Sequence, residues 1–356
     1  MKSTLEGEPI DGNATAVVDL PSATDLDVDD DHGAEALASV APNPQPAVRS
    51  VDQPEETQPT QISWPHAIAI PTVHLLALLA LLPWLFSWSG LVLAIVGFFA
   101  YGLLGINLCY HRILTHGGVK LPKWLEHCFA TLGVCCLQDS PARWVAIHRL
   151  HHKHSDHRPD PHTPLVNFLW GHIGWLFVKH SDHSRYRFYE QYARDILRDP
   201  FYLRFERKLF WFWTYVIHAA LYFVVGLAIG WATTGVYLSG VQLGASWLVW
   251  GVFVRTVVEW HNTWSVNSIT HLWGYRNYET RDDSRNHWLV ALTAHGEGWH
   301  NNHHADQRSA KHGHKWWEYD LTWAVIRSLE IVGLARNVIR PKAQPQPKPG
   351  ANRAPE

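Results

Sequence analysis

The stretch Trp144-Val-Ala-Ile-His148-Arg-Leu-His151-His152 is the part of the sequence around which the rest of the chain is organised. Positions i, i+3 and i+4 lie on one face of an α-helix, so the three histidines can present their imidazoles toward one point. Neutral imidazole is the commonest nitrogen ligand for iron, zinc and copper, whereas magnesium and calcium take oxygen ligands. Because acidic residues are sparse here, the spacing predicts a transition-metal site.

Two other histidine clusters accompany the first. The segment His300-Asn-Asn-His303-His304 has the same spacing, and His111 and His116 form a pair upstream. Structural zinc takes four protein ligands and catalytic zinc takes three and a water, so the clusters hold too many imidazoles for one ion. The sequence therefore predicts two metal ions. Seven other histidines lack such spacing and are expected to have no ligand role: His32, His154, His157, His180, His183, His312 and His314.

Four apolar stretches lie around these clusters, at about residues 68–86, 91–110, 209–231 and 236–258. Each is close to the ~20 residues that an α-helix needs to cross the hydrocarbon core of a bilayer. A short uncharged turn joins the first two stretches, and another joins the last two. The stretches therefore predict two transmembrane hairpins.

Lysine and arginine are distributed unevenly about these stretches. The two short turns contain none, whereas residues 112–208 contain 15. By the positive-inside rule, residues 111–208 and 259–340 lie on the cytoplasmic side, where they form a largely helical cap. The predicted fold is an all-α integral membrane domain, residues 63–340, whose cap holds the metals. An apolar chain could reach these metals from the membrane, so a lipid-like substrate is expected.

The two ends of the chain differ from this domain. Residues 1–62 contain 13 acidic residues against Lys2 and Arg49, with many prolines and no aromatic residue, which predicts a disordered acidic tail. Its net charge of −11 leaves +9 for the rest of a chain whose formal charge is −2. Residues 341–356 are also expected to be disordered.

The four cysteines lack Cys-x-x-Cys spacing, which argues against zinc-ribbon and thioredoxin-like folds. No nucleic acid partner is predicted.

Four motifs place histidine, asparagine or glutamate at fixed spacing. They are His111-Arg-Ile-Leu-Thr-His116, His148-Arg-Leu-His-His152, Asn267-Ser-Ile-Thr-His271 and Glu297-Gly-Trp-His-Asn-Asn-His-His304. Together they resemble the motifs of the integral-membrane fatty acyl desaturases of the stearoyl-CoA desaturase type. The resemblance runs from about Ile68 to Arg340. Residues 274–286 are more similar to bacterial and plant members, and Asp139 stands where animal enzymes have an asparagine near the thioester, so an acyl chain on a glycerolipid is an alternative to acyl-CoA.

This resemblance implies a centre of two iron ions with nine histidine ligands. The matching positions are His111, His116, His148, His151, His152, His271, His300, His303 and His304. Asn267 matches a residue that approaches one iron through a water, and its spacing of four to His271 suits that role. The element Asp160-Pro-His162 also matches the family, and a structural or supporting role is expected for it.

The resemblance also implies a reaction. Dioxygen and two electrons remove two hydrogens from adjacent methylenes of a saturated acyl chain and leave a cis double bond, at Δ9 for this type. The chain would lie in a bent apolar tunnel, and Gln138, Trp144 and Thr263 match positions that line the bend. No cytochrome b5 domain is fused, so a separate protein, ferredoxin or cytochrome b5, is expected to supply the electrons.

Two other functions remain open. Membrane di-iron fatty acid hydroxylases and alkane monooxygenases use similar histidine clusters, although Asn267 ahead of the third cluster favours a desaturase. A non-enzymatic metal transporter is a more remote alternative, because transporters place their ligands within membrane helices near the midplane. In this chain the histidines lie at helix ends and in the cap.

Overall fold

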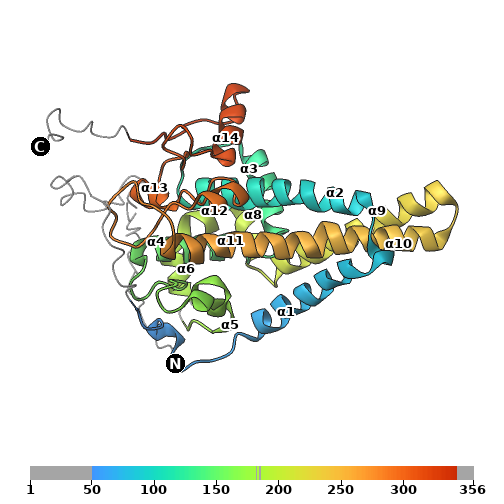
Figure 1. The fold of residues 1–356 in the computed structure, drawn as a ribbon, viewed down its shortest axis with the longest axis horizontal. Helices are drawn as coiled ribbons and strands as arrows, with labels where there is room; N and C mark the ends of the chain where they lie inside the picture. The colour runs from blue at the N-terminus through green and yellow to red at the C-terminus, as the bar shows by residue number, and fades with distance from the viewer. Residues whose placement is uncertain (1–49, 182, 184–185, 343–356) are drawn as a thin grey trace, which may run out of the picture. The chain divides into compact units, whose positions relative to one another are not determined.

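The computed structural model describes residues 50–342 except 182, 184 and 185, and all of these belong to one compact unit. The described residues form helices and loops, and their only β-type pairings are isolated bridges such as that between Ile62 and Val178. Figure 1 shows long helices running side by side toward one end of this unit and short helices gathered at the other end. The prediction of an all-α fold is confirmed.

Four helical segments are long and apolar enough to cross a membrane: Trp64–Leu81, Trp88–Thr115, Phe210–Thr234 and Tyr237–Leu272. The first consists of α1 (Trp64–Leu78) and one further turn, and the third is α9 (Phe210–Thr234). The second consists of α2 (Trp88–Gly97) and the π-helical η4 (Phe98–Thr115). The fourth consists of α10 (Tyr237–Leu248), η6 (Val249–Val254) and α11 (Arg255–Leu272). The predicted four spans are confirmed, and the chain is a multi-pass membrane protein.

The second and fourth segments are longer than the apolar stretches that predict them. At 1.5 Å per residue, their 28 and 36 residues correspond to roughly 42 and 54 Å, whereas the hydrocarbon core is about 30 Å thick. Hydropathy marks only the part inside the bilayer, and helical hydrogen bonding continues beyond it where the cap covers polar side chains. These extensions carry His111 and His271 beyond the apolar stretches and in among the cap helices.

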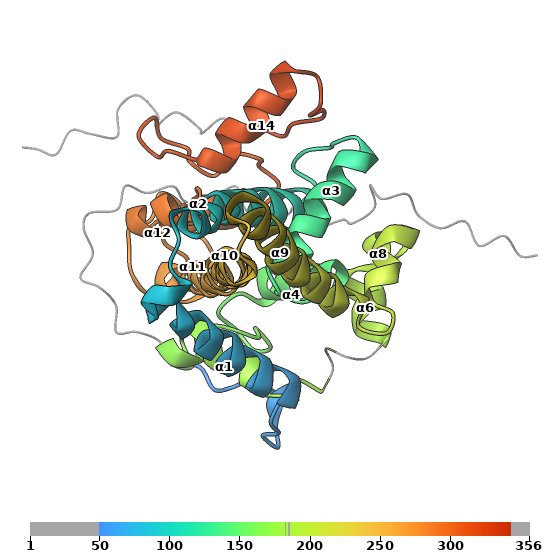
Figure 2. The same ribbon diagram turned by 90° about the vertical axis from the view of Figure 1, so that its right-hand side faces the viewer.

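The α9–α10 hairpin is held together by close backbone approach. A Cβ atom at Gly226 would lie 2.8 Å from Cα of Gly244, and one at Gly230 would lie 2.8 Å from Cα of Gly240. Such distances are too short for any side chain, so these glycines let the two helices touch along their length. Small residues at helix contacts are a common packing device in membranes. In Figure 2 the hairpin lies toward the viewer, beside α11 and α2.

The cap is built from short helices. They are α3 (Lys123–Val134), α4 (Pro141–His154), η5 (Trp170–Gly174), α5 (Trp175–Phe177), α6 (Tyr186–Tyr192), α7 (Arg194–Leu197), α8 (Pro200–Phe205), α12 (Trp288–Thr293), α13 (His300–Ala305) and α14 (Leu321–Ile331). The central one for the site is α4, which begins with Pro141 and is capped by Ser140, whose Oγ accepts from the N–H of Arg143 at 3.3 Å.

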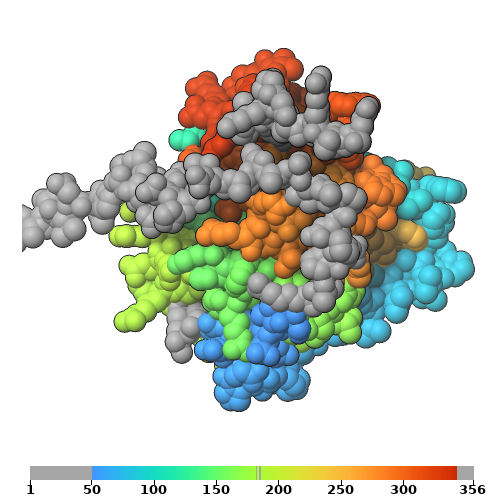
Figure 3. Space-filling model, turned by 60° about the vertical axis from the view of Figure 1, so that its left-hand side comes forward, coloured from blue at the N-terminus to red at the C-terminus, as the bar shows by residue number. Residues whose placement is uncertain are grey.

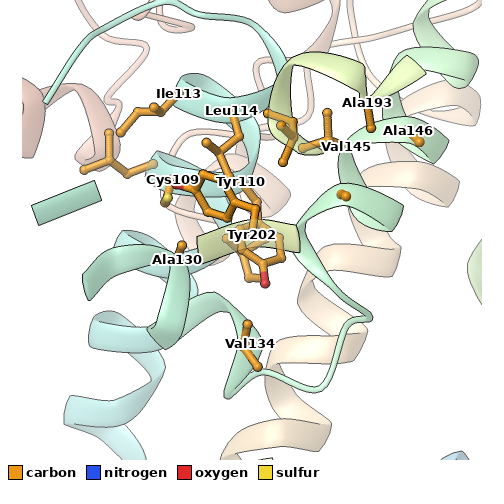
Figure 4. Close-up of a cluster of buried hydrophobic side chains, with 14 of the residues drawn as sticks. Cys109, Tyr110, Ile113, Leu114, Ala130, Val134, Val145, Ala146, Ala193 and Tyr202 are labelled. Carbon is orange, nitrogen blue, oxygen red and sulfur yellow. The ribbon is translucent and has the colours of Figure 1, made fainter. Parts of the chain in front are cut away.

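One apolar core joins the cap to the second membrane segment. Tyr110 of η4 is fully buried among side chains of α3, α4 and α8, including Val134, Val145 and Tyr202, as Figure 4 shows. Burial of such side chains stabilises by about 1.5–3 kcal/mol each, so this core fixes α4 rigidly against η4. Two of the predicted histidine clusters therefore have a fixed relative position.

Residues 50–62 lie at the end of the predicted acidic tail. They contain a short 3-10 helix, η1 (Glu55–Thr57), in which Thr57 is fully buried. The N–H of Lys179 donates to the carbonyl of Gln61 at 2.8 Å, and Figure 3 shows this blue segment beside the green one that follows α4. Residues 1–49 and 343–356, which make up the rest of the predicted tails, lie outside the described residues, and the boundaries at 62 and 340 stay predictions.

Candidate metal centre

The nine predicted histidines lie together in two groups at the cap end of the long helices. The five-histidine group consists of His111, His116, His148, His152 and His303, and the four-histidine group consists of His151, His271, His300 and His304. Within each group one nitrogen of every ring lies within 4.8 Å of the others. Four separate helices contribute, namely η4, α4, α11 and α13.

Each His-x-x-His-His triplet is divided between the two groups. His148 and His152 belong to the five-histidine group and His151 to the four-histidine group, while α13 is divided in the opposite sense. The prediction that a triplet presents three imidazoles toward one point is therefore wrong. Adjacent helical residues point about 100° apart, so neighbours such as His151 and His152 face different points. Each triplet thereby bridges the two groups.

The His111–His116 pair depends on a π-helical turn. A spacing of five would place two side chains on different faces of an ordinary α-helix, but residues five apart lie on one face of a π-helix. The N–H of His116 donates to the carbonyl of His111 at 3.2 Å, which is the π-type hydrogen bond. The ring centroids are 4.8 Å apart, and both rings face the same group. π-Helical turns often mark functional sites.

The distances between ring nitrogens fit metal ligands. The Nε2 atom of His303 lies 3.1 Å from Nε2 of His111 and 3.0 Å from Nε2 of His152. Two nitrogens that are each about 2.1 Å from one ion and at right angles would be roughly 3 Å apart. In the four-histidine group, Nε2 of His271 and Nε2 of His300 are 3.0 Å apart. This geometry suits one ion in each group.

Several buried ring nitrogens have no protein partner. Among the described residues, Nε2 of His116, His151 and His304 makes no hydrogen bond although it is shielded from solvent. A buried polar atom without a partner costs about 1–3 kcal/mol, so such atoms call for an explanation. Coordination of a metal ion by these lone pairs provides one.

Four of the nine histidine rings have a carboxylate beside Nδ1, on the side of the ring away from Nε2. The Nδ1 atom of each ring faces one carboxylate oxygen, so Nε2 is left for a metal. The pairs are His111 with Glu297 at 2.7 Å, His151 with Asp160 at 3.0 Å, His271 with Asp156 at 2.7 Å and His304 with Asp282 at 2.7 Å. This arrangement is typical of metal centres, in which partners outside the ligands fix the tautomer and the ring orientation.

The electrostatics favour the neutral form of four of these histidines. Burial lowers the pKa of His148, His152, His300 and His303 well below the ordinary value, and neighbouring imidazoles lower each pKa further. Burial alone would raise the pKa of Asp156, but its pairing with His271 holds that pKa below the ordinary value. These four neutral imidazoles can bind a metal, and an ionised carboxylate, Asp156, lies behind His271.

Some supporting residues are not predicted by the sequence. Asp156 and Asp282 are far in sequence from the histidines they contact, and no spacing rule connects them. His312, expected to have no ligand role, is buried, and its Nδ1 lies 3.0 Å from Oε2 of Glu297. Glu297 also accepts from Nε of Arg112 at 3.0 Å. The sequence motif that begins with Glu297 drew attention to this residue, but it did not indicate that Glu297 contacts His312 and Arg112.

A cavity of about 1060 Å³ leads from the histidines into the membrane part. It is reached by His111, His148 and His300, and Asn267 also lines it. Most of its wall is apolar, from side chains such as Ile70, Val73, Leu76, Phe253 and Trp260. Binding sites for small apolar ligands have this composition, with a few polar groups at fixed positions.

The three predicted tunnel residues form a hydrogen-bonded chain on the cavity wall. Trp144 Nε1 lies 3.4 Å from Oε1 of Gln138, and Gln138 Nε2 donates to Oγ1 of Thr263 at 3.0 Å. The Trp144 ring also stacks on His148, with centroids 4.9 Å apart. These contacts connect the cavity wall to the five-histidine group.

Comparison with known proteins agrees with this geometry. The family model named Fatty acid desaturase matches residues 82–334. An sn-1 stearoyl-lipid 9-desaturase from Anabaena variabilis is 44% identical over 278 residues, covering 78% of this chain and 94% of that protein. An sn-2 palmitoyl-lipid 9-desaturase from Nostoc sp. (strain 36) is 40% identical, covering 80% and 93%. An acyl-CoA 5-desaturase from Anemone leveillei is 40% identical, covering 81% and 86%. The chain therefore belongs to the fatty acid desaturase family, and it is an oxidoreductase that desaturates fatty acyl chains.

Proposed function

We propose that this desaturase introduces a cis double bond at Δ9 into a saturated acyl chain carried by a membrane glycerolipid. In the overall reaction, –CH2–CH2– with O2, two electrons and two protons gives –CH=CH– and two waters. The proposed position and carrier are supported by the similar cyanobacterial proteins, which are named stearoyl-lipid and palmitoyl-lipid 9-desaturases. One similar protein is named an acyl-CoA 5-desaturase, so another double-bond position and an acyl-CoA carrier are the alternatives to be tested.

We assign one iron ion to each histidine group. The donor set of neutral imidazoles suits iron better than magnesium or calcium, and the nitrogen separations near 3.0 Å suit one ion per group. Bound iron would supply the oxygen chemistry needed to break two unactivated C–H bonds. The carboxylates of Asp156, Asp160 and Asp282 hold the rings in position for it.

The observation that carries this proposal is the cavity joined to the histidines. It would hold an acyl chain with two adjacent methylenes beside His148 and His300, and its apolar wall would exclude water from them. An unactivated C–H bond offers no acid or base handle, so the protein acts mainly by positioning. Trp144, Gln138 and Thr263 would fix the wall at that point, and Asn267 would hold a water between the wall and His271.

The electrons would come from a separate protein, ferredoxin or cytochrome b5. The cap, and with it the histidine groups, would lie on the cytoplasmic side, as the positive-inside rule supports. The excess of Lys and Arg in the cap would attract an acidic donor from that side.

Expression in a desaturase-deficient host tests the proposed function. Total fatty acids are analysed by gas chromatography and mass spectrometry after derivatisation of double bonds, with His151→Ala as the control. A new Δ9 monoenoic acid that is absent from the control is expected. Hydroxylated acids would favour the hydroxylase alternative, and an unchanged profile in a host that supplies both electron donors would contradict the proposal.

A further inference from the structure

The cavity reaches the surface between α1 and α9. Ile68 and Thr72 line it from α1, while Leu209 and Phe212 line it from the start of α9. Ile68 is 62% exposed and Leu209 is 60% exposed. Residues that line a cavity and are also exposed mark its mouth. The mouth therefore lies between the first turns of α1 and the start of α9.

α1 is held on one side only. It packs against η6, α11 and α5, with Ile70 and Val73 buried against Trp260 and Trp264. On the same side His74 is hydrogen-bonded through Nε2 to Nε2 of His261, at 3.1 Å. Among the described residues no hydrogen bond or ring contact joins α1 to α9. Figures 1 and 2 show the two helices apart where both begin.

The mouth lies at the level of the membrane. Ile68 and Thr72 belong to the span Trp64–Leu81, and Phe212 belongs to the span Phe210–Thr234. Large apolar side chains are exposed beside it, including Trp64 at 64% and Trp213 at 54%. An exposed apolar rim on membrane-spanning helices faces lipid, so molecules of the bilayer meet this mouth first.

The cap end of the cavity is polar and contains both signs of charge. Nε of Arg143 lies 3.2 Å from Oδ2 of Asp139, and Nε2 of His66 lies 3.7 Å from the same oxygen. Glu206 lines this end as well. Such a mixture of donors and acceptors suits ester and hydroxyl groups, and the two carboxylates oppose a highly anionic carrier.

We propose that the gap between α1 and α9 is a lateral portal through which one acyl chain of an intact glycerolipid enters the cavity from the adjoining leaflet. This inference rests on the proposed function. A glycerolipid must keep its second chain in the bilayer while the first chain reaches the histidines, and only a sideways opening allows both. The glycerol esters then lie at the polar end, near Arg143 and Asp139.

A reversible cross-link across the portal tests this inference. Cys128 is the one exposed cysteine among the four native ones and is first replaced by Ser. Thr72→Cys and Phe212→Cys are added to this protein, and a bis-maleimide with a reducible linker joins them. The matched control pair, Thr233→Cys with Ser239→Cys, lies at the turn between α9 and α10, at the opposite end of α9 from the portal. Iron content and alkene formation are measured on each sample before and after reduction.

With stearoyl-glycerolipid vesicles, the portal cross-link is expected to lower turnover at least tenfold at unchanged iron content, and reduction is expected to restore it. The control cross-link leaves turnover unchanged. Full lipid turnover with the portal cross-link verified by mass would overturn the inference, whereas loss of lipid turnover with retained acyl-CoA turnover would support it. Absence of alkene from the parent protein without cysteine substitutions would instead contradict the proposed function, so the two failures are distinguishable.

Discussion

The Oδ2 atom of Asp156 lies 2.7 Å from Nδ1 of His271, on the side of the ring away from His300. Both side chains are completely buried, and the same Asp156 oxygen accepts from the N–H of Asp283 at 2.8 Å. One carboxylate therefore joins the loop after α4, helix α11 and the loop before α12. The orientation of a proposed ligand thus depends on a residue from another element.

Asp156→Asn is expected to weaken metal binding in the four-histidine group. An amide keeps the size of the side chain but removes the charge that orients His271, and loss of such a partner typically costs 10–100-fold in affinity or activity. Iron per chain after dialysis against a chelator is the measurement. Glu330→Gln is the matched control, because Glu330 pairs with Arg327 on α14, outside the site. Equal iron retention in both variants would contradict this role of Asp156.

Neighbouring histidines of one triplet should affect different ions. His151→Ala removes one of four rings from the four-histidine group, whereas His152→Ala removes one of five from the other group. We expect both variants to lose alkene formation, with iron falling toward one per chain and more completely in His151→Ala. Iron analysis and iron spectroscopy distinguish the residual ions. Identical residual spectra would show that the triplet serves a single site.

Thr263→Val tests the hydrogen-bonded chain on the cavity wall. Valine matches the shape of threonine but cannot accept from Gln138 Nε2. Leaving the donor of such a hydrogen bond unpaired costs about 1–3 kcal/mol, which corresponds to roughly 5- to 150-fold in turnover. We expect slower turnover and alkene at a second position, with iron content unchanged. Loss of iron would assign Thr263 to the metal centre instead.

The stability of the cap should fall at acid pH because of two stacked histidines on the cavity wall. The rings of His180 and His183 have centroids 4.4 Å apart, and burial lowers the pKa of His180 to about 4 and that of His183 to about 2. The unfolded pKa is about 6.5, so between these values the unfolded chain binds more protons and stability decreases as pH falls. For His180 the loss between pH 7 and 5 is about 2 kcal/mol.

Thermal unfolding at pH 7 and pH 5 measures this effect. His180→Gln should unfold at more similar temperatures at the two pH values than the parent protein does. His157→Gln, at an exposed position, is the control and should keep the parent difference. An unchanged difference in His180→Gln would show that other groups cause the acid sensitivity.

The sequence predicted those features that local spacing determines. Hydropathy identified four spans, and histidine spacing together with the family resemblance identified all nine rings that the structure gathers. Helix geometry alone separates His151 from His152, but spacing could not show which rings join each of them, because that depends on where α13 and η4 lie. Nor could it show the π-helical turn that aligns His111 and His116, because a spacing of five does not fit one face of an α-helix. Asp156 and Asp282 were missed because loops bring them to the site.

The central claim is desaturation at Δ9 of a glycerolipid chain, and one isotope measurement tests it most directly. The purified iron-loaded protein receives electrons from ferredoxin or cytochrome b5 and a stearoyl-glycerolipid that is fully deuterated at carbons 9 and 10. Mass spectrometry of the product is expected to show an alkene that has lost one deuterium from each labelled carbon. An alkene that retains all the deuterium, or a hydroxylated chain, would contradict the account.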